Sequence, residues 1–235
     1  MKRTFLLLIL LSWCLHSDAS VVCIHGFLVN NTTMMPLKRC LEKSGFDVCL
    51  YKYEAREETL QCHGLRLKEM LKQMARNNPG EPINFVAHSI GGVVLRVALS
   101  LPGCPEEAKI GRAVLLAPPN RGSMLGRKMK DVLPIKIAMG EKSGKQLLEY
   151  SPCQMLALGT FPPTCQVLVI AGARGMNKGF DNRPNDGYLA VEETRLDTPH
   201  AFMTLDLKHG ALLTNRESLR LTRDFLLSGQ IPVCK

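Results

Sequence analysis

One serine lies in a sequence context that suits a nucleophile. Residues 83–88 form the run INFVAH, which predicts a buried strand, and a helical pattern starts at Gly91, so Ser89 stands in the turn between them. A turn this sharp needs small residues two positions before and two positions after the serine, and Ala87 and Gly91 meet that demand. The pattern predicts that the Ser89 hydroxyl projects above one edge of a sheet, in position to attack a carbonyl carbon.

Two backbone N–H groups are expected to bind the negative charge that develops on a substrate oxygen. The helix after Ser89 directs its N-terminal N–H groups at that oxygen, and Ile90 carries the first donor. The second donor is expected in the loop after the strand candidate 21–24, where the chain reads HGF and Phe27 is the candidate. His25 is expected to order this loop through hydrogen bonds rather than to exchange protons.

These motifs resemble the α/β-hydrolase superfamily, in particular its small bacterial lipases and esterases. The resemblance rests on HGF at 25–27, on AHSIGG at 87–92 and on LAPPNRGS at 116–123. The third motif is similar to the segment that follows the next strand in these lipases. The resemblance extends over about residues 20–228 and implies a serine hydrolase that needs no metal and no organic cofactor.

Two positions depart from the usual pattern of that superfamily. Ala87 stands where most members have the first glycine of the turn, and a small side chain satisfies the steric demand there. Asn120 stands where these lipases usually have histidine. The resemblance implies cleavage of carboxylic esters, of lipids or other acyl compounds, through an acyl-enzyme on Ser89. Two alternatives stay open: an acyltransferase with the same acyl-enzyme, and a catalytically silent module that binds lipid or protein.

The superfamily order of Ser, then Asp or Glu, then His restricts the choice of the general base. Only His200 and His209 follow Ser89 in the chain. His209 is preferred because it follows the strand candidate 201–207, where a loop can bring its imidazole over the edge of the sheet. His200 precedes that strand and is expected at its far end.

The acid that orients the histidine is expected in the loop after the strand candidate 166–171, chiefly Asp181 or Asp186. Asp186 is preferred because its segment, NDGYLAV, resembles the segment that carries the acid in related lipases. It would hold His209 in the tautomer that accepts the Ser89 proton and would stabilise the resulting imidazolium. An Asn-Asp-Gly run is also ordinary turn chemistry, so this role is a hypothesis.

Strand-like and helical patterns alternate along the chain, which predicts an α/β fold with a mostly parallel central sheet and helices on both faces. The strand candidates are 21–24, 46–53, 83–88, 113–117, 166–171 and 201–207. Helices are expected at about 31–45, around the apolar repeat 67–74, at 91–101 and at 215–227. The stretch 120–164 predicts a short inserted cap, whose apolar and basic residues suit either a lid that touches lipid or a lid packed on the sheet.

The composition excludes several classes of protein. A chain of 235 residues that is 46% hydrophobic and 22% charged is neither disordered nor a multi-pass membrane protein. The 30 basic and 21 acidic residues give a net charge of +9, which favours peripheral contact with an anionic membrane surface. Nucleic acid is not an expected partner, because the cations are scattered and one Trp and four Tyr offer few rings for base stacking.

Residues 1–19 predict a signal peptide. Two basic residues precede the apolar run 5–11, which is too short to span a bilayer, and cleavage is expected after Ala19. This predicts export of the domain 20–235 to the periplasm or the medium. A hydrophobic first strand and an uncleaved anchor are the alternatives.

Nine cysteines are present, eight of them after the expected cleavage point. An even number permits disulfides in an exported chain, but the pairing cannot be read from spacing. Cysteines and histidines do not cluster at metal-ligand spacing, so no metal site is expected. The sequence gives no indication of the oligomeric state.

Overall fold

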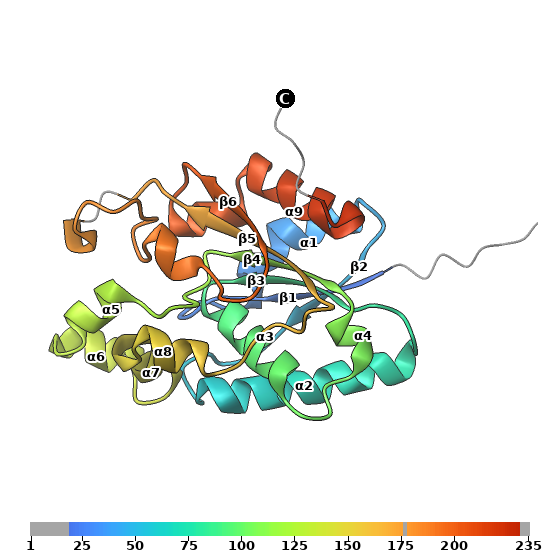
Figure 1. The fold of residues 1–235 in the computed structure, drawn as a ribbon, viewed down its shortest axis with the longest axis horizontal. Coiled ribbons are helices and arrows are strands. Elements are labelled where there is room, and N and C mark those ends of the chain that lie inside the picture. Colours follow the sequence, from blue (N-terminus) through green and yellow to red (C-terminus); the bar gives the residue numbers. More distant parts are fainter. Residues whose placement is uncertain (1–18, 176–177, 231–235) are drawn as a thin grey trace, which may run out of the picture.

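The central sheet has six strands, all parallel, in the order β2-β1-β3-β4-β5-β6 (Figure 1). The computed structural model describes residues 19–175 and 178–230. The strands are β1 Ser20–Ile24, β2 Asp47–Tyr51, β3 Asn84–His88, β4 Arg112–Leu116, β5 Gln166–Gly172 and β6 Ala201–Leu205. Each coincides with one of the six apolar runs in the sequence. The expectation of a mostly parallel sheet is confirmed.

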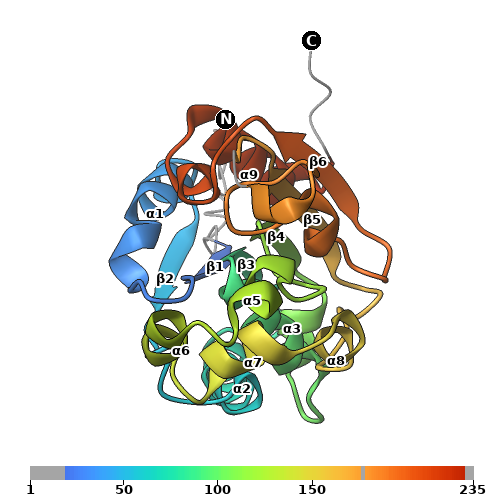
Figure 2. The same ribbon diagram turned by 90° about the vertical axis from the view of Figure 1, so that its left-hand side faces the viewer.

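Helices cover both faces of the sheet, as the alternating pattern predicts (Figure 2). The long helices are α1 Met35–Glu42, α2 Leu60–Asn77, α3 Ile90–Ser100 and α9 Arg216–Ser228. Helices α2 and α3 lie on one face, and α1 and α9 lie on the other. The short elements are α4 Glu106–Lys109, η1 Asn31–Met34, η2 Lys178–Phe180, η3 Val191–Thr194 and η4 His209–Leu213.

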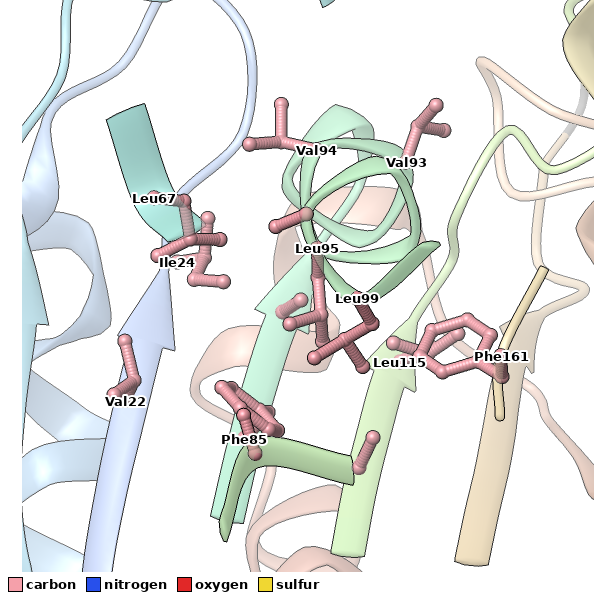
Figure 3. Close-up of a cluster of buried hydrophobic side chains, with 14 of the residues drawn as sticks. Val22, Ile24, Leu67, Phe85, Val93, Val94, Leu95, Leu99, Leu115 and Phe161 are labelled. Atoms are coloured by element: carbon pink, nitrogen blue, oxygen red, sulfur yellow. The ribbon is translucent and has the colours of Figure 1, made fainter. Parts of the chain in front are cut away.

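The larger core lies between the sheet and α3. Successive side chains of a strand point to opposite faces, so Val22 and Phe85 pack toward α3 while Val21 and Val86 pack toward α1 and α9. Figure 3 shows the α3 side, with labelled residues Val22, Ile24, Leu67, Phe85, Val93, Val94, Leu95, Leu99, Leu115 and Phe161. Burial on both faces explains why the strands are continuous apolar runs rather than alternating ones.

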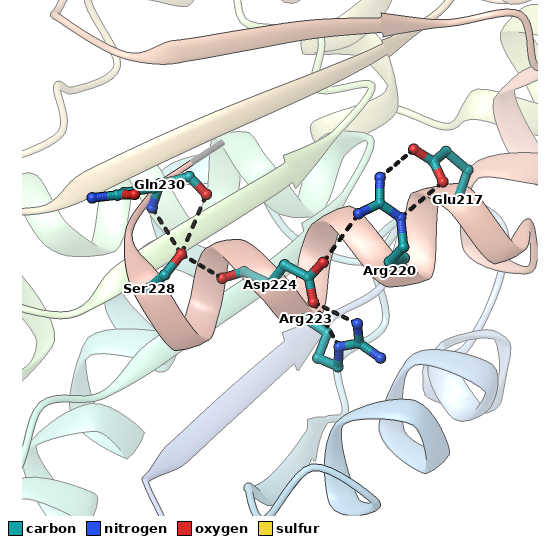
Figure 4. Close-up of polar contacts among 6 residues, drawn as sticks. All are labelled: Glu217, Arg220, Arg223, Asp224, Ser228 and Gln230. Atoms are coloured by element: carbon teal, nitrogen blue, oxygen red, sulfur yellow. Dashed lines mark hydrogen bonds and ion pairs between the residues drawn. The ribbon is translucent and has the colours of Figure 1, made fainter. Parts of the chain in front are cut away.

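Helix α9 shows how a covering helix divides its two faces. Its apolar residues Leu221 and Phe225 are buried against the sheet. Its outer face and end carry the hydrogen-bonded set in Figure 4: Glu217, Arg220, Arg223, Asp224, Ser228 and Gln230. Exposed ion pairs contribute little to stability, so the buried face fixes the position of this helix.

The strand order places two loops side by side at one edge of the sheet. Strand β1 lies between β2 and β3, and Ile24 at its end is paired with Ala87 of β3. The loops that leave the carboxyl ends of β1 and β3 therefore start next to each other. The chain order of the strands reverses direction at β1, and in open parallel sheets ligands bind in the crevice at such a point, outside the carboxyl ends of the strands.

Four short helices occupy the segment between β4 and β5. They are α5 Met124–Met129, α6 Leu133–Met139, α7 Ser143–Glu149 and α8 Pro152–Leu156, and they lie together at one end of the sheet (Figures 1 and 2). Helix α7 is bonded to the start of α2, since Gln146 Oε1 accepts a hydrogen bond of 2.8 Å from the N–H of Leu60, the first residue of α2. Helix α6 contains no buried residue.

Some sequence predictions concern features outside the described residues. The predicted signal peptide lies almost wholly in residues 1–18, which are not described. The seven cysteines of the described ranges, Cys23 to Cys165, are free thiols, while Cys14 and Cys234 lie beyond those ranges. Within the described chain, no helix has the length and apolar character needed to cross a membrane. The same residues contain no group of three or more His, Cys, Asp or Glu side chains that could hold a metal ion.

Candidate active site

Ser89 occupies a backbone conformation that residues with side chains rarely adopt. It follows β3 directly and has φ 53° and ψ −129°, and α3 begins at the next residue. Its N–H donates to the Leu116 carbonyl at 2.8 Å, which ties the turn to the end of β4. Such conformations are strained and persist where the surrounding structure enforces them, commonly at functional sites. The half-buried Ser89 is thus held in a tight turn at the carboxyl edge of the sheet.

Two glycines let the loop after β1 pack against this turn. A Cβ atom at Gly26 would lie 2.9 Å from His88 Nδ1 and 3.2 Å from the Ser89 Cβ. A Cβ atom at Gly91 would lie 2.6 Å from the His25 carbonyl oxygen. Neither position has room for a side chain, so the spacing of small residues in the sequence reflects direct contact between the two loops.

The expected oxyanion donors belong to these two loops. Ile90 is the first residue of α3, so its N–H has no acceptor within the helix. Phe27 follows Gly26, the residue packed against Ser89. The ring nitrogens of His25 face the carbonyl oxygens of Gly26 at 2.8 Å and of Tyr53 at 3.1 Å, so the expected hydrogen bonding of His25 is confirmed.

His25 stays uncharged in this loop. Burial lowers its pKa, so the neutral ring donates to one of the two carbonyl groups at a time. The Tyr53 hydroxyl donates in return to the His25 carbonyl at 2.9 Å. These contacts brace the loop from its buried side.

Asp186 and His209 form a hydrogen-bonded pair. Asp186 Oδ2 lies 2.6 Å from His209 Nδ1, and the carboxylate side chain is only 1% exposed. Asp186 Oδ1 accepts the N–H groups of Tyr188 at 2.9 Å and of Leu189 at 2.8 Å. These two backbone donors hold the carboxylate so that its other oxygen meets the imidazole. With Nδ1 engaged, His209 Nε2 is the ring nitrogen left to accept a proton.

The Asn-Asp-Gly run is both a turn and the support of this carboxylate. Asn185 Oδ1 accepts the Gly187 N–H at 3.0 Å, and Gly187 has a positive φ of 102°. The turn directs Asp186 toward the start of η4, where His209 N–H also donates to the Asp186 carbonyl at 3.0 Å. The run is therefore a turn that also places the Asp186 carboxylate against His209.

His88 links the histidine loop to the serine turn. It directly precedes Ser89, its ring centroid lies 4.7 Å from that of His209, and its Nε2 lies 3.4 Å from the His209 carbonyl oxygen. Burial, and then the nearby His209, lower the pKa of His88 to about 3, so His88 is neutral. Through this contact, the loop that carries His209 lies against the turn that carries Ser89.

Comparisons with known proteins agree with this architecture. Residues 16–116 match the family model described as "Putative serine esterase (DUF676)". Similar solved structures include a mature lipase of Bacillus licheniformis, with a TM-score of 0.75 and 15% identity over 90% of this chain and 93% of that one. An esterase of Pyrococcus furiosus has a TM-score of 0.66 and 19% identity over 90% of this chain and 82% of that one. A monoacylglycerol lipase of Paleococcus ferrophilus has a TM-score of 0.58 and 15% identity over 90% of this chain and 95% of that one. The chain has the α/β-hydrolase fold.

The resemblance found in the sequence motifs is thereby confirmed at the level of the fold. The comparison with curated proteins gave no match. The match of residues 16–116 to a serine esterase family model supports a carboxylic ester hydrolase.

The structure places the two rival residues, Asp181 and His200, elsewhere. Asp181 is exposed and forms an ion pair of 2.9 Å with Lys128 of α5, which lowers the pKa of its carboxyl group. His200 lies before β6, and its Nδ1 faces the Thr198 carbonyl at 2.8 Å. Neither contacts the pair formed by Asp186 and His209.

Two further residues have positions that the sequence does not indicate. Tyr188 is 67% exposed, and its ring centroid lies 5.3 Å from that of His209, so an aromatic ring stands beside this histidine at the surface. The segment around Asp186 contained this tyrosine, but no periodicity indicated where its ring points. Asn120, which replaces the usual histidine, is fully buried and donates to the Thr194 carbonyl at 2.7 Å. Asn120 therefore binds two loops together.

Proposed function

We propose that this α/β-hydrolase cleaves carboxylic esters with Ser89 as nucleophile, His209 as general base and Asp186 as the acid that orients it. One observation carries the proposal. A serine with a positive φ stands at the end of β3, next to a loop whose histidine is bonded at 2.6 Å to a buried carboxylate. A structural role alone needs neither the strained turn nor the buried hydrogen bond between a carboxylate and an imidazole.

The reaction follows in two halves. Ser89 Oγ attacks the ester carbonyl carbon while His209 Nε2 takes the hydroxyl proton, and the imidazolium then gives that proton to the departing alcohol. The C–O bond of the ester breaks, and the acyl group remains on Ser89. A water molecule then attacks the acyl-enzyme with His209 again as base, and release of the carboxylic acid restores the serine.

The surroundings of each group favour the charges that develop. The Asp186 carboxylate, held by two backbone N–H groups, stabilises the imidazolium formed on His209. The backbone N–H groups of Phe27 and Ile90 would stabilise the oxyanion, and one such donor typically contributes about 10²–10³ in rate.

We infer that the substrates are lipid or other acyl esters, and that the cap contacts an anionic membrane surface. On α6, Leu133 and Ile137 are 66% and 62% exposed, on either side of Lys136. Leu28, which follows the expected oxyanion donor Phe27, is also exposed. Apolar side chains among cations suit the interface of an anionic bilayer. A lipase and a monoacylglycerol lipase among the similar structures agree with such a substrate. Export through the predicted signal peptide is part of the same proposal.

The test is hydrolysis of p-nitrophenyl esters of increasing acyl length by wild type and by Ser89→Ala, Asp186→Asn and His209→Ala. We expect each substitution to lower kcat by at least about 10³-fold, because the three residues act as a unit. The matched controls are the rivals, Asp181→Asn and His200→Gln, and we expect changes of threefold or less.

Three outcomes would contradict the proposal. Full activity of Ser89→Ala would exclude Ser89 as the nucleophile. A folded wild type that is inactive toward every ester would favour a binding module. Transfer of the acyl group to an added alcohol at low concentration, in preference to water, would identify an acyltransferase.

A further inference from the structure

Glu193 is a buried carboxylate that lies outside the expected triad. It belongs to η3, in the connection between β5 and β6, and is only 5% exposed. Its Oε2 accepts the Ala190 N–H at 2.9 Å, and its Oε1 accepts the Met124 N–H. Arg127 Nη2 lies 3.8 Å from Oε1. A carboxylate removed from water is costly unless its oxygens are bonded, and here both are.

The two hydrogen bonds connect different parts of the molecule. Met124 is the first residue of α5, in the cap, whereas Ala190 closes the turn that carries Asp186. In Figures 1 and 2, α5 lies beside the orange segment that follows β5. The Arg121 N–H also donates to the Glu193 carbonyl at 2.9 Å. The side chain and backbone of Glu193 together bind the start of the cap to the loop 185–190, which carries Asp186.

A short chain of contacts leads from Ala190 to the catalytic pair. Ala190 forms a bridge with Asn185, and Asp186 N–H donates to the Leu189 carbonyl at 3.0 Å. Leu189 N–H in turn donates to Asp186 Oδ1. Residues 185–190 therefore form a closed loop, and Glu193 holds the end of that loop.

A second contact between the same two parts lies at the surface. Lys128 of α5 donates to the Gly179 carbonyl at 2.8 Å and to Asp181 at 2.9 Å. Both Lys128 and Asp181 are exposed, so water and salt weaken this pair, whereas the Glu193 carboxylate is shielded from both. Of these two contacts, the one made by Glu193 is therefore the stronger link between α5 and the loop 185–190.

We propose that Glu193 is a positioning residue, which joins α5 of the cap to the Asp186 loop and so keeps Asp186 aligned with His209. The catalytic part of this inference rests on the proposed function, but the joint itself does not. Small displacements of catalytic groups cost up to about 10²-fold in rate. We therefore expect Glu193→Gln to lower kcat by about 10- to 100-fold. The two N–H groups bond to different oxygens of Glu193, and in glutamine one of these positions is an NH₂ group that cannot accept.

The bond can also be removed from its other end. Met124 is the first residue of α5, a position where proline is tolerated, and Ser123 before it has the extended conformation that proline requires (φ −131°, ψ 114°). Met124→Pro deletes the N–H that Glu193 accepts and keeps the helix, while Met124→Ala keeps the N–H and serves as its control. Glu192→Gln is the control for Glu193, since Glu192 is exposed and pairs with Arg183 at the surface.

The test combines three measurements on the full chain: kcat and KM, hydrogen exchange, and the low-field proton NMR signal of the bond between His209 and Asp186. For Glu193→Gln and Met124→Pro we expect faster exchange in both α5 and residues 185–190, and a shifted NMR signal. We expect no change in Glu192→Gln or Met124→Ala. A purely structural role would reduce the folded fraction without shifting the signal of the folded molecules.

The inference is overturned if folded Glu193→Gln keeps the wild-type NMR signal and kcat, or if exchange increases in α5 alone. Exchange and NMR report on the joint whether or not the protein is an esterase. A coupled joint in a chain without esterase activity would therefore contradict the proposed function and leave the joint intact.

Discussion

The carboxyl edge of the sheet and the cap beside it are held by different means. The loops of the carboxyl edge leave the ends of strands that are buried on both faces, and this packing enforces the positive φ of Ser89. The cap consists of helices of five to seven residues, too short to be stable alone, and α6 buries none of its residues. Besides burying Leu148 and Met155, the cap is held by buried polar side chains. Gln146 of α7 accepts the first N–H of α2, and Glu193 of η3 accepts the first N–H of α5.

This difference separates two kinds of effect. Substitutions at the edge should alter the chemical step, because each group there has one position fixed by the core. Substitutions on the exposed face of the cap should leave the chemistry intact and alter which surfaces and substrates the protein contacts. Glu193 lies where the two regions meet and should affect both.

The largest expected effect is that of Asp186→Asn on kcat. An amide can still accept the N–H groups of Tyr188 and Leu189, but it no longer stabilises the imidazolium or the required tautomer of His209. We expect kcat to fall by about 10³–10⁴-fold with the fold retained. Steady-state kinetics on a short-chain ester, with circular dichroism as a check of folding, measures this. A loss below tenfold would mean that the edge does not depend on this carboxylate.

The contact between the β1 loop and the serine turn predicts the next effect. Gly26→Ala places a Cβ 2.9 Å from His88 Nδ1, which forces a shift of the loop. We expect a loss of about 1–3 kcal/mol in the free energy of unfolding, as for overpacked cores, and a fall in kcat of about 10²-fold as Phe27 N–H moves. Urea unfolding and kinetics measure the two. Gly210→Ala is the control for stability, because a Cβ there meets nothing within 4 Å. Equal stability of both variants would contradict the contact.

The buried His88 predicts how the stability of the edge depends on pH. Its pKa is lowered from 6.5 to about 3 by folding. Between these two pH values, His88 binds a proton in the unfolded chain but not in the folded one. The contribution of His88 to stability is therefore present above pH 6.5 and is lost as the pH falls toward 3. Between pH 6.5 and 5 we expect wild type to lose about 2 kcal/mol more than a folded His88→Gln variant. Urea unfolding at the two pH values checks this, and parallel losses would show that His88 does not titrate in this way.

The smallest expected effect on the fold belongs to the exposed face of the cap. Replacing Leu133 and Ile137 together by Ser should change the free energy of unfolding by at most about 0.5 kcal/mol, because neither is buried. Binding to vesicles that contain phosphatidylglycerol should nevertheless weaken several-fold, measured by co-sedimentation. If the variant binds these vesicles as well as wild type, or if wild type binds vesicles of phosphatidylcholine alone equally well, the cap does not make the proposed contact with an anionic membrane.

The sequence predicted the edge far better than the cap, for a physical reason. Strand β3, Ser89 and the start of α3 are specified by neighbouring residues, because the apolar run, the tight turn and the small side chains are all local. The strand candidates and the long helices likewise follow from composition and period. The short α4 gave no signal of its own.

Contacts between distant segments could not be predicted in this way. The preference for Asp186 over Asp181 rests on a resemblance of its segment, because chain order allows both. Only the folded chain shows which of the two contacts His209. Glu193 is one of two adjacent glutamates in the sequence. Burial against α5, which depends on the tertiary structure, distinguishes it from the exposed Glu192.

The central claim is that one hydroxyl, that of Ser89, is activated at the edge of the sheet. Its most direct test is mass spectrometry of the folded protein after reaction with a fluorophosphonate, followed by peptide mapping. We predict one adduct per chain, located on Ser89, absent from Ser89→Ala and formed far more slowly by His209→Ala. An adduct on another residue, or no adduct on folded wild type, would contradict the account.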